Sequence, residues 1–232
     1  MTGVAAVTPH LFVPGTGIVR TSILATWADV VTGLLSNRTT SPRIAVTLDL
    51  DVHLLDQPVG AQQVTLVASV VKAGRSIVVC SVEMRADDDA APFGVGHATF
   101  MASPNPAHIA PGGFPDEMPG ERGILTRPVA ERAGVRSRGD GTVEIPLVAD
   151  NLNATGALQG GLLGLAAEQA VLDQAPGTVV TSMALRYLRA VRVGPAVAVA
   201  TTHSSLARVE VHDAGSGTLS TIGTFVMAPA AG

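Results

Sequence analysis

The sequence predicts an α+β fold in which two antiparallel sheets are each wrapped around one long central helix. Three observations lead to this prediction: two similar apolar helical segments, strand-like segments after each of them, and a Pro- and Gly-rich stretch between the two sets. Of the 232 residues, 47% are hydrophobic and 15% are charged, which is enough apolar material for a packed core. The length suits one large domain or two small ones.

The two helical segments match each other along their length. The segment "GIVRTSILATWAD", which begins at Gly17, aligns with "GALQGGLLGLAAE", which begins at Gly156. Asp29 then meets Glu168 at the same offset of 139 residues. Each segment opens with a glycine turn, continues with small and apolar residues, and ends on an acid. A helix that is apolar nearly all round must be covered on most sides, which predicts that a sheet wraps around it.

Alternating apolar residues and β-branched residues predict the strands. In the first half the predicted strands are "VTLDLDVHLL", "AQQVTLVASVVKA", "SIVVCSVEMRA" and "GVGHATFM". In the second half, a short helix over 127–134 and a strand over 142–150 precede the glycine turn. The halves match again where 47–60 aligns with 181–194 at an offset of 134, and where "HATFMA" aligns with "IGTFVMA". Matches in the same order along both halves indicate a duplicated domain.

The stretch between the two copies predicts the domain boundaries. Residues 102–123 are rich in Pro and Gly and have no apolar period, as is typical of a linker. We therefore expect an N-terminal domain over 1–101, a linker over 102–123 and a C-terminal domain over 124–232.

Composition and charge exclude several classes of function. The net charge of −4, with no basic run interleaved with aromatics, argues against nucleic acid as a partner. The longest apolar runs, 162–167 and 193–200, are far shorter than a membrane span. The N-terminus has no basic region before its first cation, Arg20, so we expect no signal peptide and a soluble, cytoplasmic protein. The six histidines show no ligand spacing, so we expect no metal site. Cys80 has no second cysteine with which to form a disulfide.

The second helix opens with a motif that resembles a known family. The pattern N-x-x-G-x-x-Q-G-G, followed by a long apolar helix with a carboxylate, resembles the hotdog fold and, more narrowly, the PaaI-type acyl-CoA thioesterases. That family has Asn, Gly, His-Gly-Gly, and an acid seven residues past the second glycine. The matching positions here are Asn153, Gly156, Gln159, Gly160, Gly161 and Glu168.

The resemblance extends over nearly the whole chain, as a tandem double hotdog. "RYLRAVRVG" resembles the family's strand with a Tyr-Leu pair and a closing Gly, and "KAGRS" resembles its Gly-Arg hairpin. Two departures stand out. Gln159 replaces the family's His, and the first copy has a different set of residues at the motif positions. These are Pro14, Arg20, Thr21 and Ser22, in place of Asn153, Gln159, Gly160 and Gly161. The resemblance implies thioester hydrolysis, with coenzyme A as part of the substrate and no further cofactor.

Helix geometry predicts that the site combines residues of both copies. Thioester hydrolysis needs hydrogen-bond donors for the oxyanion and a carboxylate at the same carbonyl. The N–H groups at the start of the second helix, at Gly160, could be those donors, with the Asn153 side chain beside them. Glu168 lies about 12 Å further along the same helix, because each residue advances it by 1.5 Å. The carboxylate must therefore come from the other copy.

Two composite sites follow from this reasoning. In the first, Asp29 faces Gly160, Gln159 and Asn153 and carries out catalysis. In the second, Glu168 faces Thr21 and Arg20, and the start of the first helix, which would form the mouth of this site, departs further from the family's pattern. Lys72 and Arg75 are candidates to bind the phosphates of coenzyme A, as are Arg186, Arg189 and Arg192; the alternative is that the hairpin "KAGRS" is an ordinary solvated turn.

Two other functions compete with the thioesterase hypothesis. A hotdog hydratase would pair an Asp with a His five residues later, whereas Leu34 follows Asp29 and Asp173 follows Glu168 at that spacing. A non-catalytic protein that binds or senses acyl-CoA is the second alternative. Because exposed sheet edges favour further pairing, we also expect a homodimer of these chains.

Overall fold

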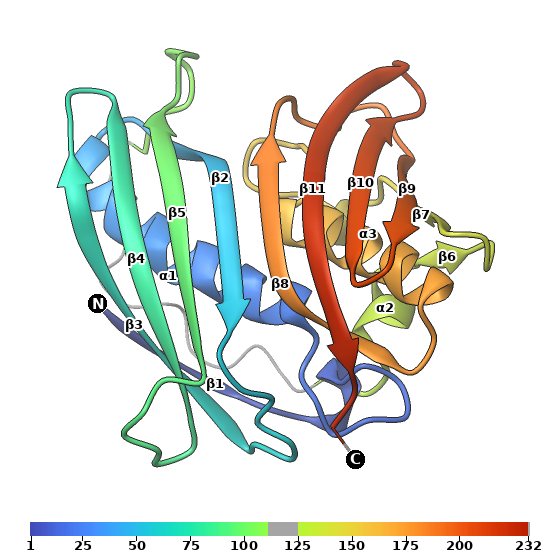
Figure 1. Ribbon diagram of the computed structural model, residues 1–232. Coiled ribbons are helices and arrows are strands. Elements are labelled where there is room, and N and C mark those ends of the chain that lie inside the picture. The colour runs from blue at the N-terminus through green and yellow to red at the C-terminus, as the bar shows by residue number, and fades with distance from the viewer. Residues whose placement is uncertain (111–124, 232) are drawn as a thin grey trace.

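The computed structural model describes residues 1–110 and 125–231, and the predicted linker over 102–123 falls largely outside this part of the chain. The described residues form one 11-stranded sheet, in the order β1-β3-β4-β5-β2-β8-β11-β10-β9-β7-β6, with every neighbouring pair antiparallel (Figure 1). The predicted domain boundaries remain a prediction.

Both halves contain a strand, a 3-10 turn, a long helix and four strands in the same order, and the second half has two further elements, α2 and β6, before them. The first half contains β1 (Thr2–Ala6), the 3-10 turn η1 (Pro9–Leu11), helix α1 (Thr21–Thr40), β2 (Ala45–Leu54), β3 (Gln63–Ala73), β4 (Ile77–Ala86) and β5 (Gly94–Ala102). The second half contains α2 (Val129–Arg132), β6 (Arg136–Ser137), β7 (Thr142–Ile145), η2 (Ala149–Asn151), α3 (Gly160–Gln174), β8 (Thr178–Tyr187), β9 (Ala196–His203), β10 (Leu206–Asp213) and β11 (Thr218–Pro229). The four strands predicted in the first half are present.

Helices α1 and α3 lie side by side on the same face of the sheet (Figure 1). Their small and apolar residues form the centre of the core: Leu24, Ala28, Ala166, Ala167 and Val171 are at most 1% exposed. Burial of such a wide apolar surface explains how two helices without a polar face are stable here. None of the described helices is both long and apolar enough to cross a membrane.

The prediction of two sheets is wrong, because the two half-sheets join into one. Strand β2 pairs with β8 in antiparallel register, with Leu50 opposite Leu185 and Val52 opposite Met183. Without this pairing, each half-sheet would leave a row of unpaired backbone N–H and C=O groups at its edge. The joint satisfies those groups and makes the sheet continuous.

The register of this joint also corrects the alignment of the two halves. Side chains at Leu50 and Val52 point to the core, as do those of Met183 and Leu185, so the halves must match at an odd offset over these strands. The β-bulges decide which one: β2 bulges at residue 48 and β8 at residue 181, an offset of 133. The offset of 134 from the sequence aligns core positions of β2 with outward positions of β8, and is wrong by one residue.

The two helices approach most closely at Gly161. A Cβ atom at this position would lie 2.2 Å from Thr26 Oγ1 and 3.0 Å from Thr26 Cβ, inside van der Waals contact. Rotation of Thr26 offers no relief, because its Cγ2 would be 2.8 Å away and its Oγ1 donates a hydrogen bond to the Ser22 carbonyl. The glycine pair at the start of α3 is therefore needed for helix packing as well as for any chemistry.

We expect Gly161→Ala to lower the free energy of unfolding by about 1 to 3 kcal/mol, because the added methyl group forces the helices apart. Gly164→Ala is the matched control on the same helix. Its Cβ would meet no atom closer than 3.4 Å, so the better helix propensity of Ala should leave stability unchanged or raise it by up to about 1 kcal/mol. Urea unfolding of both variants measures the difference, and equal effects would contradict the close approach at Gly161.

Candidate active site

The N-terminal turns of α1 and α3 run antiparallel, so that the start of each helix meets an acid of the other. Thr21 at the start of α1 contacts Glu168 of α3, and Thr26 packs on Gly161. Both helices begin in the same way, since the N-cap residues Arg20 and Gln159 are 139 apart and neither helix has a side-chain cap. Uncapped helix starts leave backbone N–H groups available for another acceptor.

At one of the two sites the protein itself supplies that acceptor. The Thr21 N–H donates to Glu168 Oε1 at 2.8 Å, and the Ser22 hydroxyl donates to Oε2 at 2.5 Å. The Arg20 guanidinium lies 3.6 Å from Oε2 and donates to Gln169 Oε1 at 2.8 Å. Glu168 is 0% exposed and Arg20 is 2% exposed. The carboxylate therefore occupies the place that a substrate oxygen would need, and the site is sealed.

The other site, at Asp29, is open by comparison. Asp29 is partly exposed, and the Thr47 hydroxyl donates to its Oδ1 at 2.7 Å. Burial of the carboxyl group raises the pKa of Asp29 from 3.8 to about 6, although the hydrogen bond from Thr47 acts in the opposite direction. A carboxyl group with this pKa is ionised at neutral pH and still accepts protons readily.

Tyr187 connects Asp29 to the start of α3. Its hydroxyl donates to the Gly160 carbonyl oxygen at 3.2 Å, and its ring would lie 3.3 Å from a Cβ atom at Gly160. Burial raises the pKa of Tyr187 well above its ordinary value, and the negative charge of neighbouring Asp29 raises it further. The structure thus brings Asp29 to the mouth of α3. Sequence analysis assigned Tyr187 no role, although it stands in the matched segment "RYLRAVRVG".

The start of α3 presents donors that are not engaged elsewhere. The N–H groups of Leu162 and Leu163 donate to the Gln159 carbonyl. Among the described residues, no acceptor is found for the N–H groups of Gly160 and Gly161. These two groups, at the positive end of the helix dipole, can bind an oxyanion next to Asp29.

Asn153 and Gln159 do not join this arrangement. Asn153 is exposed and closes its own turn: its Oδ1 accepts from the Thr155 N–H at 2.9 Å and from the Ala157 N–H at 3.2 Å. No hydrogen bond within residues 1–110 and 125–231 joins its side chain to Asp29 or to Gly160. Gln159 is exposed at the N-cap, and its side chain caps nothing. The expected side-chain donor is thus absent from the start of α3, because the hydrogen bonds that Asn153 Oδ1 accepts hold this side chain in the preceding turn.

The duplication makes the difference between the two sites explicit. At the offset of 133, Thr47 beside Asp29 corresponds to Val180, which has no hydroxyl, and Tyr187 corresponds to Leu54. Ser22 in turn replaces Gly161 and supplies the hydroxyl that holds Glu168. Each acid therefore has one hydroxyl partner. The partner of Asp29, Thr47, lies on a strand, whereas the partner of Glu168, Ser22, lies in the first turn of α1 and holds the acid over that helix start.

The candidate cations lie in different places. Lys72 and Arg75 are exposed at the β3–β4 hairpin, and β3 is four strand positions from β8, so the structure does not bring them to α3. Arg186 points to the outer face of the sheet, where it pairs with Asp51 at 2.5 Å and Asp49 at 3.3 Å. Arg189 and Arg192 are exposed on the loop that directly follows Tyr187.

In the part of the chain that the structure describes, no group of three or more His, Cys, Asp or Glu side chains could hold a metal ion.

Comparison with known proteins identifies the fold. A family model described as the thioesterase superfamily matches residues 16–92, a segment that includes Asp29 and Thr47. A 12:0-ACP thioesterase from Umbellularia californica has a similar structure, with a TM-score of 0.71 and 13% identity over 99% of this chain and 97% of that one. An acyl-ACP thioesterase from Bacteroides thetaiotaomicron VPI-5482 is similar at a TM-score of 0.68 and 12% identity, over 98% and 97% of the two chains.

A conserved protein from Alicyclobacillus acidocaldarius with the hotdog fold gives a TM-score of 0.61 and 17% identity, over 100% of this chain and 94% of that one. The fold is a hotdog fold. No curated protein matches the sequence. Because the likeness extends along whole chains at low identity, it establishes the fold, and the chemistry must be argued from the residues of this chain.

The two acids should affect stability in opposite directions. The pKa of Asp29 in the folded protein lies above its ordinary value of 3.8, so the folded state binds more protons between about pH 4 and 6, and this group lowers stability as the pH rises through that window. Asp29→Asn should raise the free energy of unfolding at pH 7.5 by about 1 to 3 kcal/mol and have little effect near pH 4.

Glu168→Gln is the matched change at the sealed site. It leaves Arg20 buried without its counter-charge and should lower the free energy of unfolding by about 3 to 5 kcal/mol. Urea unfolding of both variants at pH 4.5 and pH 7.5 measures these effects. Stabilisation by Glu168→Gln, or a loss of stability in Asp29→Asn at pH 7.5, would show that the two environments are assigned incorrectly.

Proposed function

We propose that this protein is an acyl-CoA thioesterase whose catalytic carboxylate is Asp29. One observation carries the proposal: Asp29, a partly exposed residue whose carboxyl group has a pKa raised to about 6, lies at the uncapped start of α3, whereas its counterpart Glu168 is sealed. The match of residues 16–92 to the thioesterase superfamily supports the same reaction class. The motif around Gly160 favours the PaaI-type group, and the repeated order of elements favours a tandem of two hotdog domains.

The geometry suggests how the reaction proceeds. The thioester carbonyl oxygen accepts hydrogen bonds from the Gly160 and Gly161 N–H groups, which stabilise the negative charge that develops on it. Glycine at both positions lets the substrate approach the backbone closely. Asp29 takes a proton from water as the water oxygen attacks the carbonyl carbon. The C–S bond then breaks, the thiolate takes up the proton, and the products are a carboxylic acid and a free thiol. In the alternative route Asp29 attacks that carbon itself and the thiolate leaves, and water then hydrolyses the resulting mixed anhydride, which releases the acid, regenerates Asp29 and supplies the proton that the thiolate takes up.

Neighbouring groups prepare Asp29 for this role. Thr47 holds one carboxylate oxygen at 2.7 Å, which fixes the side chain and leaves the other oxygen for water or substrate. Tyr187 holds the first turn of α3 through the Gly160 carbonyl, and it keeps its proton because its pKa is raised. These contacts come from both halves of the chain, so one copy alone cannot assemble the site.

Substitution of the two acids tests the proposal. Asp29→Asn should lower kcat by about 10²- to 10⁴-fold, the usual contribution of a general base, and leave acyl-CoA binding largely intact because the amide has nearly the same shape. Glu168→Gln should keep kcat within about tenfold in the fraction that folds, because the sealed carboxylate does not touch substrate. Hydrolysis should be assayed over aliphatic and aryl acyl-CoAs, with folding verified by circular dichroism.

Two results would count against the proposal. Loss of activity in Glu168→Gln but not in Asp29→Asn would move catalysis to the other site. Binding of acyl-CoA without turnover by the wild-type protein would favour a binding or sensing protein instead.

The raised pKa predicts the pH dependence of activity. Because only the ionised form of Asp29 accepts a proton or attacks, kcat/KM should rise about tenfold per pH unit below the pKa and level off above about pH 6. Stopped-flow or continuous thiol-release assays between pH 4.5 and 8 measure the profile. A rate that is constant down to pH 4.5 would indicate that this carboxyl group keeps its ordinary pKa or takes no part in the reaction.

A further inference from the structure

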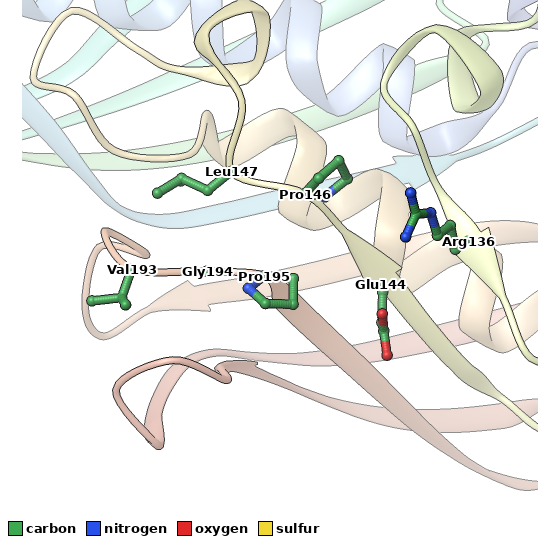
Figure 2. Close-up of a pocket in the computed structure, with 7 residues that line it drawn as sticks. All are labelled: Arg136, Glu144, Pro146, Leu147, Val193, Gly194 and Pro195. Atoms are coloured by element: carbon green, nitrogen blue, oxygen red, sulfur yellow. The ribbon is translucent and has the colours of Figure 1, made fainter.

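The described surface of the C-terminal half contains a hollow of about 320 Å³, lined in part by the loop after β7 and the loop before β9. Its walls are the end of β7 with Pro146 and Leu147, and the start of β9 with Val193 and Pro195 (Figure 2). Arg136 and Glu144 lie at one end of it, on β6 and β7 (Figure 2). This volume is at the small end of the range for ligand sites, roughly 300 to 1,000 Å³, and fits one ring system.

Two stretches of backbone run side by side from this hollow to the candidate active site. Gly194 packs on Leu147 at the hollow, where a Cβ atom on the glycine would lie 2.6 Å from Leu147 Cβ. Further along, the Leu158 N–H donates to the Val191 carbonyl at 3.0 Å. The last contact of the series is the one between Tyr187 and Gly160 at the mouth of α3. These contacts connect the hollow to the start of α3 through one continuous pair of packed segments.

The charges around the hollow favour an anionic ligand. Glu144 is paired with Arg138, whereas the Arg136 side chain is exposed and has no ion-pair or hydrogen-bond partner among the described residues. The loop 188–194, "LRAVRVG", adds Arg189 and Arg192 along the path. The equivalent loop of the first half, "LDQPVG" at 55–60, has no cation and carries an acid. A polyanion is thus attracted to the Asp29 side of the duplicated fold and not to the sealed side.

Asp213 holds the wall of the hollow in place. Its buried carboxylate accepts the N–H groups of Arg192 at 2.9 Å, Val193 at 3.1 Å and Gly194 at 2.8 Å. Burial alone would raise the pKa of Asp213, but these backbone hydrogen bonds outweigh it and lower that pKa below its ordinary value. The loop is therefore pre-organised, which reduces the entropy lost when a ligand is bound.

We propose that this hollow binds the adenosine 3′-phosphate end of coenzyme A. The base packs on Pro146, Leu147, Val193 and Pro195, and the Arg136 guanidinium pairs with phosphate, for which its planar fork of donors is well suited. The pantetheine arm follows the loop past Val191 and brings the thioester to the start of α3. The inference rests on the proposed function and adds to it the means by which the protein distinguishes acyl-CoA from a thioester without a nucleotide.

The test compares Arg136→Ala with the wild type on two substrates that share an acyl group, one attached to coenzyme A and one to pantetheine. We expect Arg136→Ala to raise KM for acyl-CoA about 10- to 100-fold, with kcat unchanged, because a charge-assisted hydrogen bond to phosphate is lost. KM for acyl-pantetheine should stay the same. Arg75→Ala is the matched control: it removes the same charge at the rival hairpin site and should change neither KM.

A direct binding measurement separates this inference from the proposed function. Calorimetry with adenosine 3′,5′-bisphosphate should show one site per chain in the wild type and a 10- to 100-fold weaker site in Arg136→Ala, whether or not the protein hydrolyses thioesters. No binding of this nucleotide, an effect of Arg75→Ala in place of Arg136→Ala, or equal KM values for acyl-CoA and acyl-pantetheine would overturn the inference. In the last case a preference for the acyl carrier protein thioester would identify the partner instead. If no thioester is hydrolysed, the proposed function fails on its own.

Discussion

The buried carboxylate of Glu168 fixes how the two halves of the molecule fit together. It belongs to the second half, yet all of its partners at the start of α1 belong to the first: the Thr21 N–H, the Ser22 hydroxyl and the Arg20 guanidinium. A buried charge tolerates little displacement from its partners, because any gap leaves it without compensation. Helices are stiff, so this contact also sets the position of Asp29 against α3, on the other side of the crossing.

This constraint explains why a symmetric duplication produces two unlike sites. A helix start has few free N–H groups, and they can bind either a protein carboxylate or a substrate oxygen. At α1 the Thr21 N–H and the Ser22 hydroxyl bind Glu168, which contributes to assembly and excludes substrate. At α3 the acid is one methylene shorter, Thr47 holds it from the adjacent strand, and the Gly160 and Gly161 N–H groups keep no acceptor among the described residues. One site therefore gives the fold its rigidity, and the other is left for chemistry.

The sequence was sufficient to predict the parts of the fold that depend on local pattern. Apolar helices, alternating strands and the offset of 139 between Asp29 and Glu168 predicted two similar halves whose helices exchange their acids. The single sheet could not be predicted in this way, because the pairing of β2 with β8 depends on which edges meet in space. The register error has a local cause: the loop over 188–194 after β8 is one residue longer than the loop over 55–60 after β2. The matched glycines at the ends of these loops therefore lie at an offset of 134, whereas the strands themselves match at 133.

The residues of the site divide in the same way into those that the sequence could predict and those that it could not. The rise per residue of a helix was enough to predict that Glu168 lies too far from Gly160 to act there, and that Asp29 of the other copy takes its place. The roles of Thr47 and Tyr187 were not predictable, since both come from strands whose order and register the sequence leaves open. Asn153 matches the family motif, but its side chain serves the turn before α3, and only three-dimensional contacts reveal that. The hollow at Arg136 is likewise assembled from two loops that are distant in sequence.

A crystal structure with an unreactive acyl-CoA analogue, in which a CH₂ group replaces the sulfur, tests the central claim most directly. The analogue keeps the carbonyl group and cannot be hydrolysed, so its position reports which helix start is open. We expect one analogue per chain, with its carbonyl oxygen within hydrogen-bond distance of the Gly160 and Gly161 N–H groups and its carbonyl carbon beside Asp29. An analogue bound at the start of α1 beside Glu168, or two analogues per chain, would contradict the division of the two sites into one sealed and one open.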